Sequence, residues 1–248
     1  MFRSIPILAL AVLALAGCSS TSVYNLQKSG APVATAPRLI FVSPFAVRAE
    51  VLHLGERSRA EKAQLGAAIS AGLASITASE LQRYAAPSAV LTAGRSPGAG
   101  TWHIRGEILK VDQGSRALRT AIGFGIGRTQ LRTRVTVTEI RADGPRTILT
   151  FRTTGSSGLE PGVAFGVVGG ASAAKTAGGA LLGSMAGVSS DMDRTAHEIA
   201  AVLSAYLSRN GLLSPSRQAL TPNIAGQLPT TINACRIVPA PVRHGLSP

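Results

Sequence analysis

The stretch RTQLRTRVTVTEIR, residues 128–141, decides the fold of this 248-residue chain. Apolar and polar side chains alternate along it: Leu131, Val135 and Val137 fall on one side, and Arg128, Arg132, Arg134 and Thr136 fall on the other. Successive side chains of a strand point to opposite faces of its sheet, so this period of two indicates a strand with one buried face. The other face of the predicted strand is basic.

Two further strand-like runs flank this one, at residues 102–112 and 147–153, and the sequence ADGP at residues 142–145 predicts a turn between strands. Upstream, hydrophobic periodicity predicts three more elements: a first strand over residues 38–45 (RLIFVSPF), a long helix over residues 56–84 and a short strand over residues 89–91. The sheet is therefore expected to contain both neighbouring hairpin strands and strands joined through a helix.

A closing helix is expected over residues 191–210, capped by Ser190 or Asp191 and ended by Gly211. The order of elements predicts an α+β domain of two layers. In it, a mixed or antiparallel sheet carries the long helix that follows the first strand and the closing C-terminal helix. A Gly/Ala-rich insert precedes this last helix.

The N-terminus is typical of an export signal. Arg3 supplies a positive charge, and residues 5–16 form an apolar run that is too short to cross a membrane. The run ends in LAGC, residues 15–18, which resembles the bacterial lipobox. The resemblance implies that residues 1–17 are a signal peptide and that Cys18 carries acyl chains such as palmitate, which anchor a protein stably to a membrane. Ser19 implies export to the outer membrane, facing the periplasm, if the source is Gram-negative.

The mature chain is expected to have three parts. Residues 18–37 are polar and predict a lipidated N-terminus followed by a flexible tether. The α+β domain is expected over residues 38–213, and residues 214–248 are proline-rich and predict a disordered tail. With Cys18 acylated, Cys235 has no partner within the chain, so its thiol is either incidental or pairs between chains.

Three segments together resemble a known family. They are GEILKVDQGSR at residues 106–116, Arg119 with IGFGIG at residues 122–127, and the strand pair that ends near Phe151. Over residues 38–211 the chain resembles the bacterial lipoprotein family called domain of unknown function 4410. That family has no established activity, so the resemblance implies no catalytic residue. The layout is also loosely similar to the periplasmic domains of curli-secretion pore lipoproteins, although a shared fold does not establish a shared function.

Glycines recur every four residues in the insert over residues 158–190. The two series are Gly158, Gly162, Gly166 and Gly170, and then Gly179, Gly183 and Gly187. Glycines at this spacing share one helix face, where two backbones can approach closely, as in a glycine zipper. The alternatives are a flexible Gly/Ala loop and a close-packed hairpin, in protein or membrane, that turns near Lys175.

The sequence contains no complete motif for catalysis, for nucleotide binding or for metal binding. GGASAAKT at residues 169–176 lacks the second glycine of a phosphate-binding loop, and Ser172 with Lys175 matches S-x-x-K without a following K-T-G. The four histidines have no ligand-type residue at metal-binding spacing: they are His53, His103, His197 and His244. An envelope hydrolase would require a polar cluster such as Ser172, Lys175 and His197. We therefore expect no catalytic residue, no cofactor and no metal site.

Charge is the clearest functional signal. The chain is 15% charged with a formal net charge of +13, and residues 101–153 hold ten basic and four acidic residues. The candidate basic surface consists of Arg116, Arg119, Arg128, Arg132 and Arg134. Guanidinium forks suit phosphates and carboxylates, so an anionic envelope surface is one expected partner, and a solvated basic face without a ligand is the alternative. Aromatic residues are only 4% of the chain, and we expect no nucleic acid.

These observations favour a non-catalytic envelope lipoprotein that acts as a periplasm-facing binding or assembly module. Its expected partners are the membrane through the N-terminal lipid, an envelope protein or anionic surface, and possibly further copies of itself. The alternative is an accessory or subunit of an oligomeric outer-membrane secretion or pore assembly. An envelope hydrolase is a second, less favoured alternative.

Overall fold

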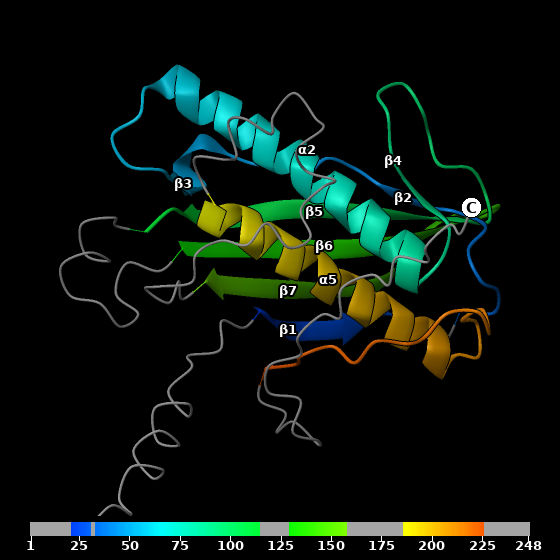
Figure 1. The fold of residues 1–248 in the computed structure, drawn as a ribbon. Helices are drawn as coiled ribbons and strands as arrows, with labels where there is room; N and C mark the ends of the chain where they lie inside the picture. Colours follow the sequence, from blue (N-terminus) through cyan, green and yellow to red (C-terminus); the bar gives the residue numbers. More distant parts are fainter. Residues whose placement is uncertain (1–20, 31–32, 115–128, 158–185, 226–248) are drawn as a thin grey trace, which may run out of the picture.

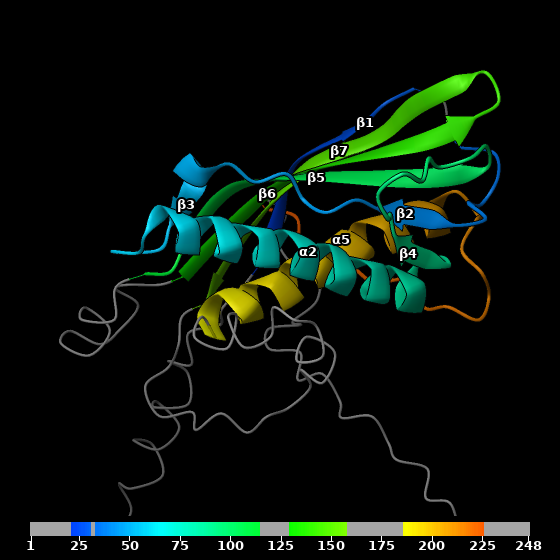
Figure 2. The same cartoon turned by 90° about the horizontal axis from the view of Figure 1, so that it is seen from above.

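The computed structural model describes residues 21–30, 33–114, 129–157 and 186–225. These residues form a seven-stranded sheet with two long helices packed on one of its faces (Figure 1). The predicted α+β class, with a helix after the first predicted strand and a closing C-terminal helix, is confirmed. Seen from above, both helices lie on the same side of the sheet, which makes two layers (Figure 2).

The sheet is mixed. Its strand order is β1-β7-β6-β5-β2-β4, and β3 pairs with β5 beyond the end of β2. The strands are β1 Thr21–Lys28, β2 Ile40–Val42, β3 Leu52–His53, β4 Ser88–Val90, β5 Thr101–Asp112, β6 Thr129–Arg141 and β7 Gly144–Ser157. β1, β7, β6 and β5 are antiparallel to their neighbours along that series, whereas β2, β3 and β4 pair in parallel. The predicted alternation in β6 is confirmed, because Leu131, Val135 and Val137 are fully buried.

The helix α2, Arg59–Tyr84, follows a short 3-10 helix, η1 Ala49–Val51, and begins with a capping box. Ser58 Oγ accepts a hydrogen bond from the Glu61 amide at 3.2 Å, and Glu61 Oε2 accepts one from the Ser58 amide at 2.8 Å. These two bonds satisfy amide groups that a helix start leaves unpaired. The hydrogen bonds from Ser58 also lower the pKa of Glu61.

The second helix, α5 Ala186–Arg209, ends as the sequence predicts. Gly211 has a φ of +69°, and the amides of Gly211 and Leu212 donate to the carbonyls of Ser208 and Leu207. This is a Schellman motif, in which a residue without Cβ takes the left-handed conformation at low energetic cost. Its beginning differs from the prediction, as described below.

The core lies between the sheet and the helices. Trp102 and Phe151 from the sheet are buried there with Ile69 and Leu73 of α2, and Trp102 meets the α5 residue Tyr206 edge-on at 6.1 Å between ring centroids. The Phe45 ring packs directly against the Cα of Gly106 in β5. A Cβ at position 106 would overlap this ring. This contact determines how closely β5 packs against the loop that follows β2.

The tether predicted over residues 18–37 is wrong for residues 21–28, which form the edge strand β1. Val23 is fully buried against the helix layer, and β1 pairs with β7. The strand escaped prediction because Asn25, at φ +52°, introduces a register shift between Tyr24 and Gln27 that interrupts the period of two. Its few apolar residues therefore show no clear alternation.

The tail predicted from residue 214 is also wrong over residues 214–225. Leu220 is buried, and Ile224 bridges to Val23 beside the outer edge of β1. The Val23 amide donates to the Asn223 carbonyl at 2.7 Å, and the Ala225 amide donates to the Val23 carbonyl at 2.7 Å. Pro222 has no amide hydrogen to donate. The backbone hydrogen bonds to β1 do not need one, because they use the carbonyl of Asn223 and the amide of Ala225. We call residues 220–225 the C-terminal strap.

The predicted start of the closing helix is wrong as well. α5 begins at Ala186, so Ser190 and Asp191 lie inside the helix and do not cap it. Asp191 is fully buried and accepts a hydrogen bond from the Thr129 hydroxyl at 2.7 Å. Glycine and serine disfavour a helix at residues 187–190, yet Val188 is fully buried in the core, and tertiary packing overrides that local preference. Residues 158–185 of the insert lie outside the described residues.

Candidate functional site

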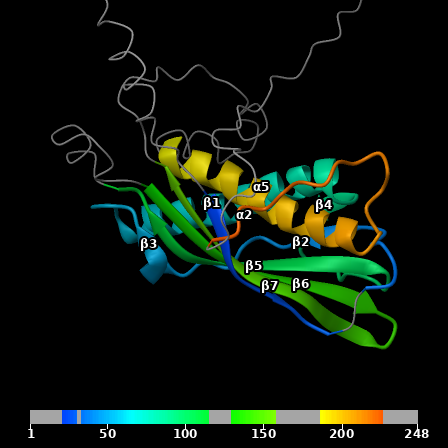
Figure 3. The same ribbon diagram turned by 90° about the horizontal axis from the view of Figure 1, so that it is seen from below.

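One face of the sheet carries neither helix nor strand among the described residues. Figures 2 and 3 show α2 and α5 together on the opposite side. The side chains on this face alternate with the core residues of four neighbouring strands, and we call it the open sheet face. It consists of Ser22 and Tyr24 of β1, Thr150, Arg152 and Thr154 of β7, Arg132, Arg134 and Thr136 of β6, and His103, Arg105 and Glu107 of β5.

A transverse row crosses this face. Tyr24 lies opposite Arg152, Arg152 opposite Arg134, and Arg134 opposite Glu107 in the strand register. Arg134 Nη1 donates to Glu107 Oε2 at 2.8 Å, and Arg48 Nη2, from the segment before η1, donates to Glu107 Oε1 at 2.8 Å. One carboxylate thus holds two guanidinium groups, and the group of three keeps one net positive charge.

The other arginines of the open sheet face have no acidic partner among the described residues. Arg105 and Arg132 are exposed and Arg152 is half-buried, and none of the three forms an ion pair there. Together with Arg48 and Arg134 they give five guanidinium groups against the Glu107 carboxylate, a net charge of +4, and the ion pair of Lys110 with Asp112 at 3.3 Å further along β5 adds no net charge. Neighbouring hydroxyls from Thr136, Thr150 and Thr154 add neutral donors beside them.

His103 lies at the β5 end of the open sheet face. Its Nε2 is 2.7 Å from Ser43 Oγ. Burial, and then the positive charge of Arg105, lower the pKa of His103, so the imidazole is neutral near neutral pH. The site therefore takes its charge from arginine alone and keeps it over a wide pH range.

Of the five residues predicted as the basic surface, Arg132 and Arg134 lie side by side on the open sheet face. Arg116, Arg119 and Arg128 lie outside the described residues. The prediction omitted Arg48, Arg105, Arg152 and Tyr24. Arg152 could have been assigned to this face from the sequence, because it alternates with Phe151 and Thr153 along the strand. The sequence does not show that Arg152 and Arg134 are neighbours, which follows from the strand register.

The predicted glycine ladder is represented in the described part only by Gly187, which is buried in the first turn of α5. The other six glycines of the ladder lie outside it, as do Cys18, Ser19 and Cys235. The hydrolase cluster is likewise represented only by His197. Its Nδ1 is 2.9 Å from Glu80 Oε2, and its ring meets Tyr84 edge-on, so it joins α5 to α2.

Acidic groups gather beside that helix contact. Burial, and then the charge of Glu80, raise the pKa of Asp193, and burial raises the pKa of Glu198. Glu198 also accepts a hydrogen bond from the Asn223 amide at 2.9 Å, so it holds the C-terminal strap. Within the described ranges no three His, Cys, Asp or Glu residues are grouped so as to hold a metal ion.

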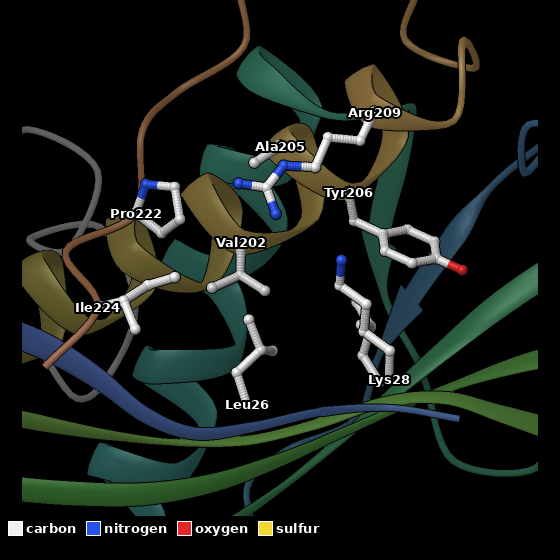
Figure 4. Close-up of a pocket in the computed structure, with 9 residues that line it drawn as sticks. Leu26, Lys28, Val202, Ala205, Tyr206, Arg209, Pro222 and Ile224 are labelled. Carbon is white, nitrogen blue, oxygen red and sulfur yellow. The ribbon is translucent and has the colours of Figure 1, made fainter. Parts of the chain in front are cut away.

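A small hollow lies between β1, α5 and the C-terminal strap (Figure 4). Leu26, Val202 and Ile224 line its apolar part, and Lys28 and Arg209 stand at its sides. Both cations are exposed. The hollow has few polar groups, and its lining is explained by the packing of the strap on the edge of the sheet.

The fold and the open sheet face define a two-layer α+β domain with one basic sheet face. The chain belongs to the family described as Domain of unknown function (DUF4410), which matches residues 40–190. This confirms the family resemblance predicted from the sequence. No curated protein matches the sequence.

The solved structures that are similar to the chain at low identity include the following two. The PelC dodecamer from Paraburkholderia phytofirmans is 10% identical with a TM-score of 0.34, covering 54% of this chain and 82% of that one. The hypothetical protein CT253 from Chlamydia trachomatis is 15% identical with a TM-score of 0.39, covering 70% and 99%. TM-scores this low carry no information about the assembly or activity of the present chain.

Among the described residues, neither helix combines the length and the apolar character that a membrane span requires.

Proposed function

We propose that this protein is a non-catalytic envelope lipoprotein that binds polyanions on its open sheet face. Acylation at Cys18 would anchor it in the outer membrane of a Gram-negative cell, facing the periplasm. The observation that carries the proposal is the gathering of Arg105, Arg132 and Arg152 on one face without an acidic partner among the described residues.

The chemistry of these groups supports a phosphate- or carboxylate-bearing ligand. Guanidinium is planar, always charged, and presents paired donors that match such oxyanions. Cross-strand neighbours repel one another when their charges are alike. Glu107 pairs with Arg134 and Arg48 but not with Arg152, so an anion that contacts Arg152 would relieve the repulsion that remains between Arg152 and Arg134. A fixed array of like charges also raises the local concentration of oppositely charged ligands.

The rigid sheet supports binding without reorganisation. Arg134 is held in place by its hydrogen bond to Glu107. Arg105 and Arg152 follow Ile104 and Phe151 in their strands, and both of these residues are buried in the core on the helix side of the sheet. Side chains on a fixed backbone lose less entropy on binding than side chains on a loop that must order. The shallow, one-sided geometry suits an extended surface or polymer more than a small molecule, which needs a concave pocket.

The test uses the lipidated mature protein in nanodiscs of zwitterionic lipid, with fluorescent polyphosphate as the probe. The variant Arg105→Gln/Arg152→Gln removes two unpaired charges from the open sheet face. The matched control, Arg59→Gln/Arg209→Gln, removes two exposed charges from the ends of the helices. Both variants change the net charge by the same amount.

The proposal predicts roughly 25-fold weaker binding for the face variant, because a basic residue near an anionic surface contributes about 1 kcal/mol, which is about fivefold in affinity. The control is expected to lose much less, and the salt dependence of binding to become shallower only in the face variant. Equal losses in both variants would show that binding follows net charge alone and would overturn the proposal.

A further inference from the structure

We propose that the open sheet face docks on the anionic headgroups of the same bilayer that holds acylated Cys18. This inference rests on the proposed function and deepens it by naming the ligand as the lipid surface. Three observations carry it: the short distance from the anchor to β1, the rigid attachment of β1, and the difference in charge between the two sides of the domain.

The distance from anchor to sheet is short. β1 begins at Thr21, three residues after Cys18. Three residues span at most roughly 10 Å, even when the chain is fully extended. Tyr24 and its partner Arg152 lie three residues further along the strand, about 10 Å from Thr21. The transverse row of the open sheet face therefore begins, at Tyr24, within roughly 20 Å of the anchor.

β1 cannot fray from the domain without breaking contacts on both of its edges. On one edge it pairs with β7, from Thr21 opposite Gly155 to Lys28 opposite Leu149. On the other edge the C-terminal strap bonds Val23 in both directions, and Asn223 Nδ2 donates to the Thr21 carbonyl at 2.8 Å. A strand held in this way transmits the position of the anchor to the sheet, so the domain stays close to the bilayer surface.

Charge determines which side of the domain faces the lipid. The open sheet face and Arg48 carry a net charge of +4. The helices α2 and α5 carry five basic and five acidic residues, which cancel. Anionic headgroups attract basic groups within a Debye length of roughly 8 Å, and between the open sheet face and the two described helices it is the open sheet face that offers an excess of them. Tyr24 adds a ring with an apolar body and a polar tip, which suits a membrane interface.

The experiment places a fluorescent label on either side of the lipidated, full mature chain. Labels are attached at Thr136→Cys, on the open sheet face, and at Ala71→Cys, on the exposed side of α2. Both are made with Cys235→Ser, since acylation occupies Cys18. The protein is reconstituted in vesicles of phosphatidylcholine, with or without phosphatidylglycerol, that contain headgroup-nitroxide lipid as a quencher.

In phosphatidylglycerol vesicles the label at Thr136→Cys is expected to be quenched more strongly than the label at Ala71→Cys. Adding Arg105→Gln/Arg152→Gln should lower the ratio of docked to undocked protein roughly 25-fold, at about fivefold for each arginine. The anchor still holds this variant on the vesicle, so lost quenching reports orientation and not detachment. Circular dichroism of each variant confirms that the domain is folded.

Equal quenching of the two labels in phosphatidylglycerol vesicles would overturn the inference. If polyphosphate still binds the open sheet face in zwitterionic nanodiscs, the proposed function stands and only the lipid surface is wrong as its ligand. If polyphosphate binding is also insensitive to Arg105→Gln/Arg152→Gln, the proposed function falls as well. Stronger quenching at Ala71→Cys would show that the helix layer faces the membrane.

Discussion

Gly106→Ala should destabilise the domain strongly, because β5 has no room for a side chain at this position. An added Cβ would overlap the Phe45 ring and would lie 2.6 Å from its Cγ. The ring is 1% exposed and cannot swing into solvent. The backbone of Phe45 is also held, since its carbonyl accepts a hydrogen bond from the Ser70 hydroxyl at 2.6 Å, and Ala46 bonds the Gly106 carbonyl at 2.8 Å.

The magnitude follows from overpacking. Forcing extra carbon into a well-packed core costs roughly 1–3 kcal/mol, and a contact this close at a fixed backbone belongs at the upper end, about 3 kcal/mol. For a domain of this size roughly 2–4 °C of melting temperature is lost per kcal/mol, so a decrease of about 6–12 °C is expected. Gly98→Ala is the matched control, since nothing lies within 4 Å of the new Cβ, and it should change stability by less than about 0.5 kcal/mol.

The assay is urea unfolding followed by circular dichroism, with the double variant Phe45→Leu/Gly106→Ala included. A smaller side chain at position 45 makes room for the new methyl group, so the double variant should be more stable than the sum of the two single effects predicts, by about 1–3 kcal/mol. Additive effects, or a Gly106→Ala variant as stable as Gly98→Ala, would refute the packing argument.

Three further predictions concern the edges and the charges of the sheet. Asn223→Ala removes the side-chain bond to the Thr21 carbonyl and should cost about 1 kcal/mol in urea unfolding, and an unchanged midpoint would mean that this bond does not stabilise the edge of the sheet. Glu107→Gln frees Arg134, so polyphosphate affinity measured by fluorescence should rise about fivefold, whereas a decrease would place the carboxylate in the ligand site. The pKa of His103 is lowered in the folded state, so near pH 6.5 and just below it the unfolded chain binds more protons than the folded chain. The free energy of unfolding should therefore fall as the pH drops through 6.5. His103→Gln should flatten this part of the stability–pH curve, and an unchanged slope would contradict the prediction.

The central part of the fold is predictable from sequence because local pattern and tertiary burial agree there. In β6 the apolar and polar residues alternate without interruption, and in α2 Leu65, Ile69 and Leu73 recur at helical spacing and are buried. Gly211 likewise has a single structural explanation, as the end of α5. Each of these signals is contained within a few turns or one strand.

The edge of the sheet was not predictable, because its two segments stabilise each other across the whole chain. β1 has a single fully buried side chain, Val23, and a register shift after it. The C-terminal strap contains Pro222 and follows Pro215, and prolines are typical of a loop. Neither segment is recognisable alone, and their pairing joins residue 23 to residue 224. A sequence without an alignment carries no information on such distant contacts.

The candidate site was predictable in composition and not in arrangement. The excess of arginine over residues 101–153 and the basic side of β6 are plain in the sequence. The strand register decides which arginines are neighbours. It places Arg134 between Arg152 of β7 and Glu107 of β5. Pairing with Glu107 also distinguishes Arg134 from the unpaired Arg105, because charge counts alone treat all arginines alike.

The most direct test of the central claim is arginine footprinting with phenylglyoxal and mass spectrometry, on the lipidated protein in vesicles with and without phosphatidylglycerol. If the open sheet face binds the anionic surface, Arg105, Arg132 and Arg152 should react more slowly in the anionic vesicles. Arg59 and Arg209, on the helices, should react equally fast in both. Protection of the helix arginines, or equal reactivity of all five in the two kinds of vesicle, would contradict the account.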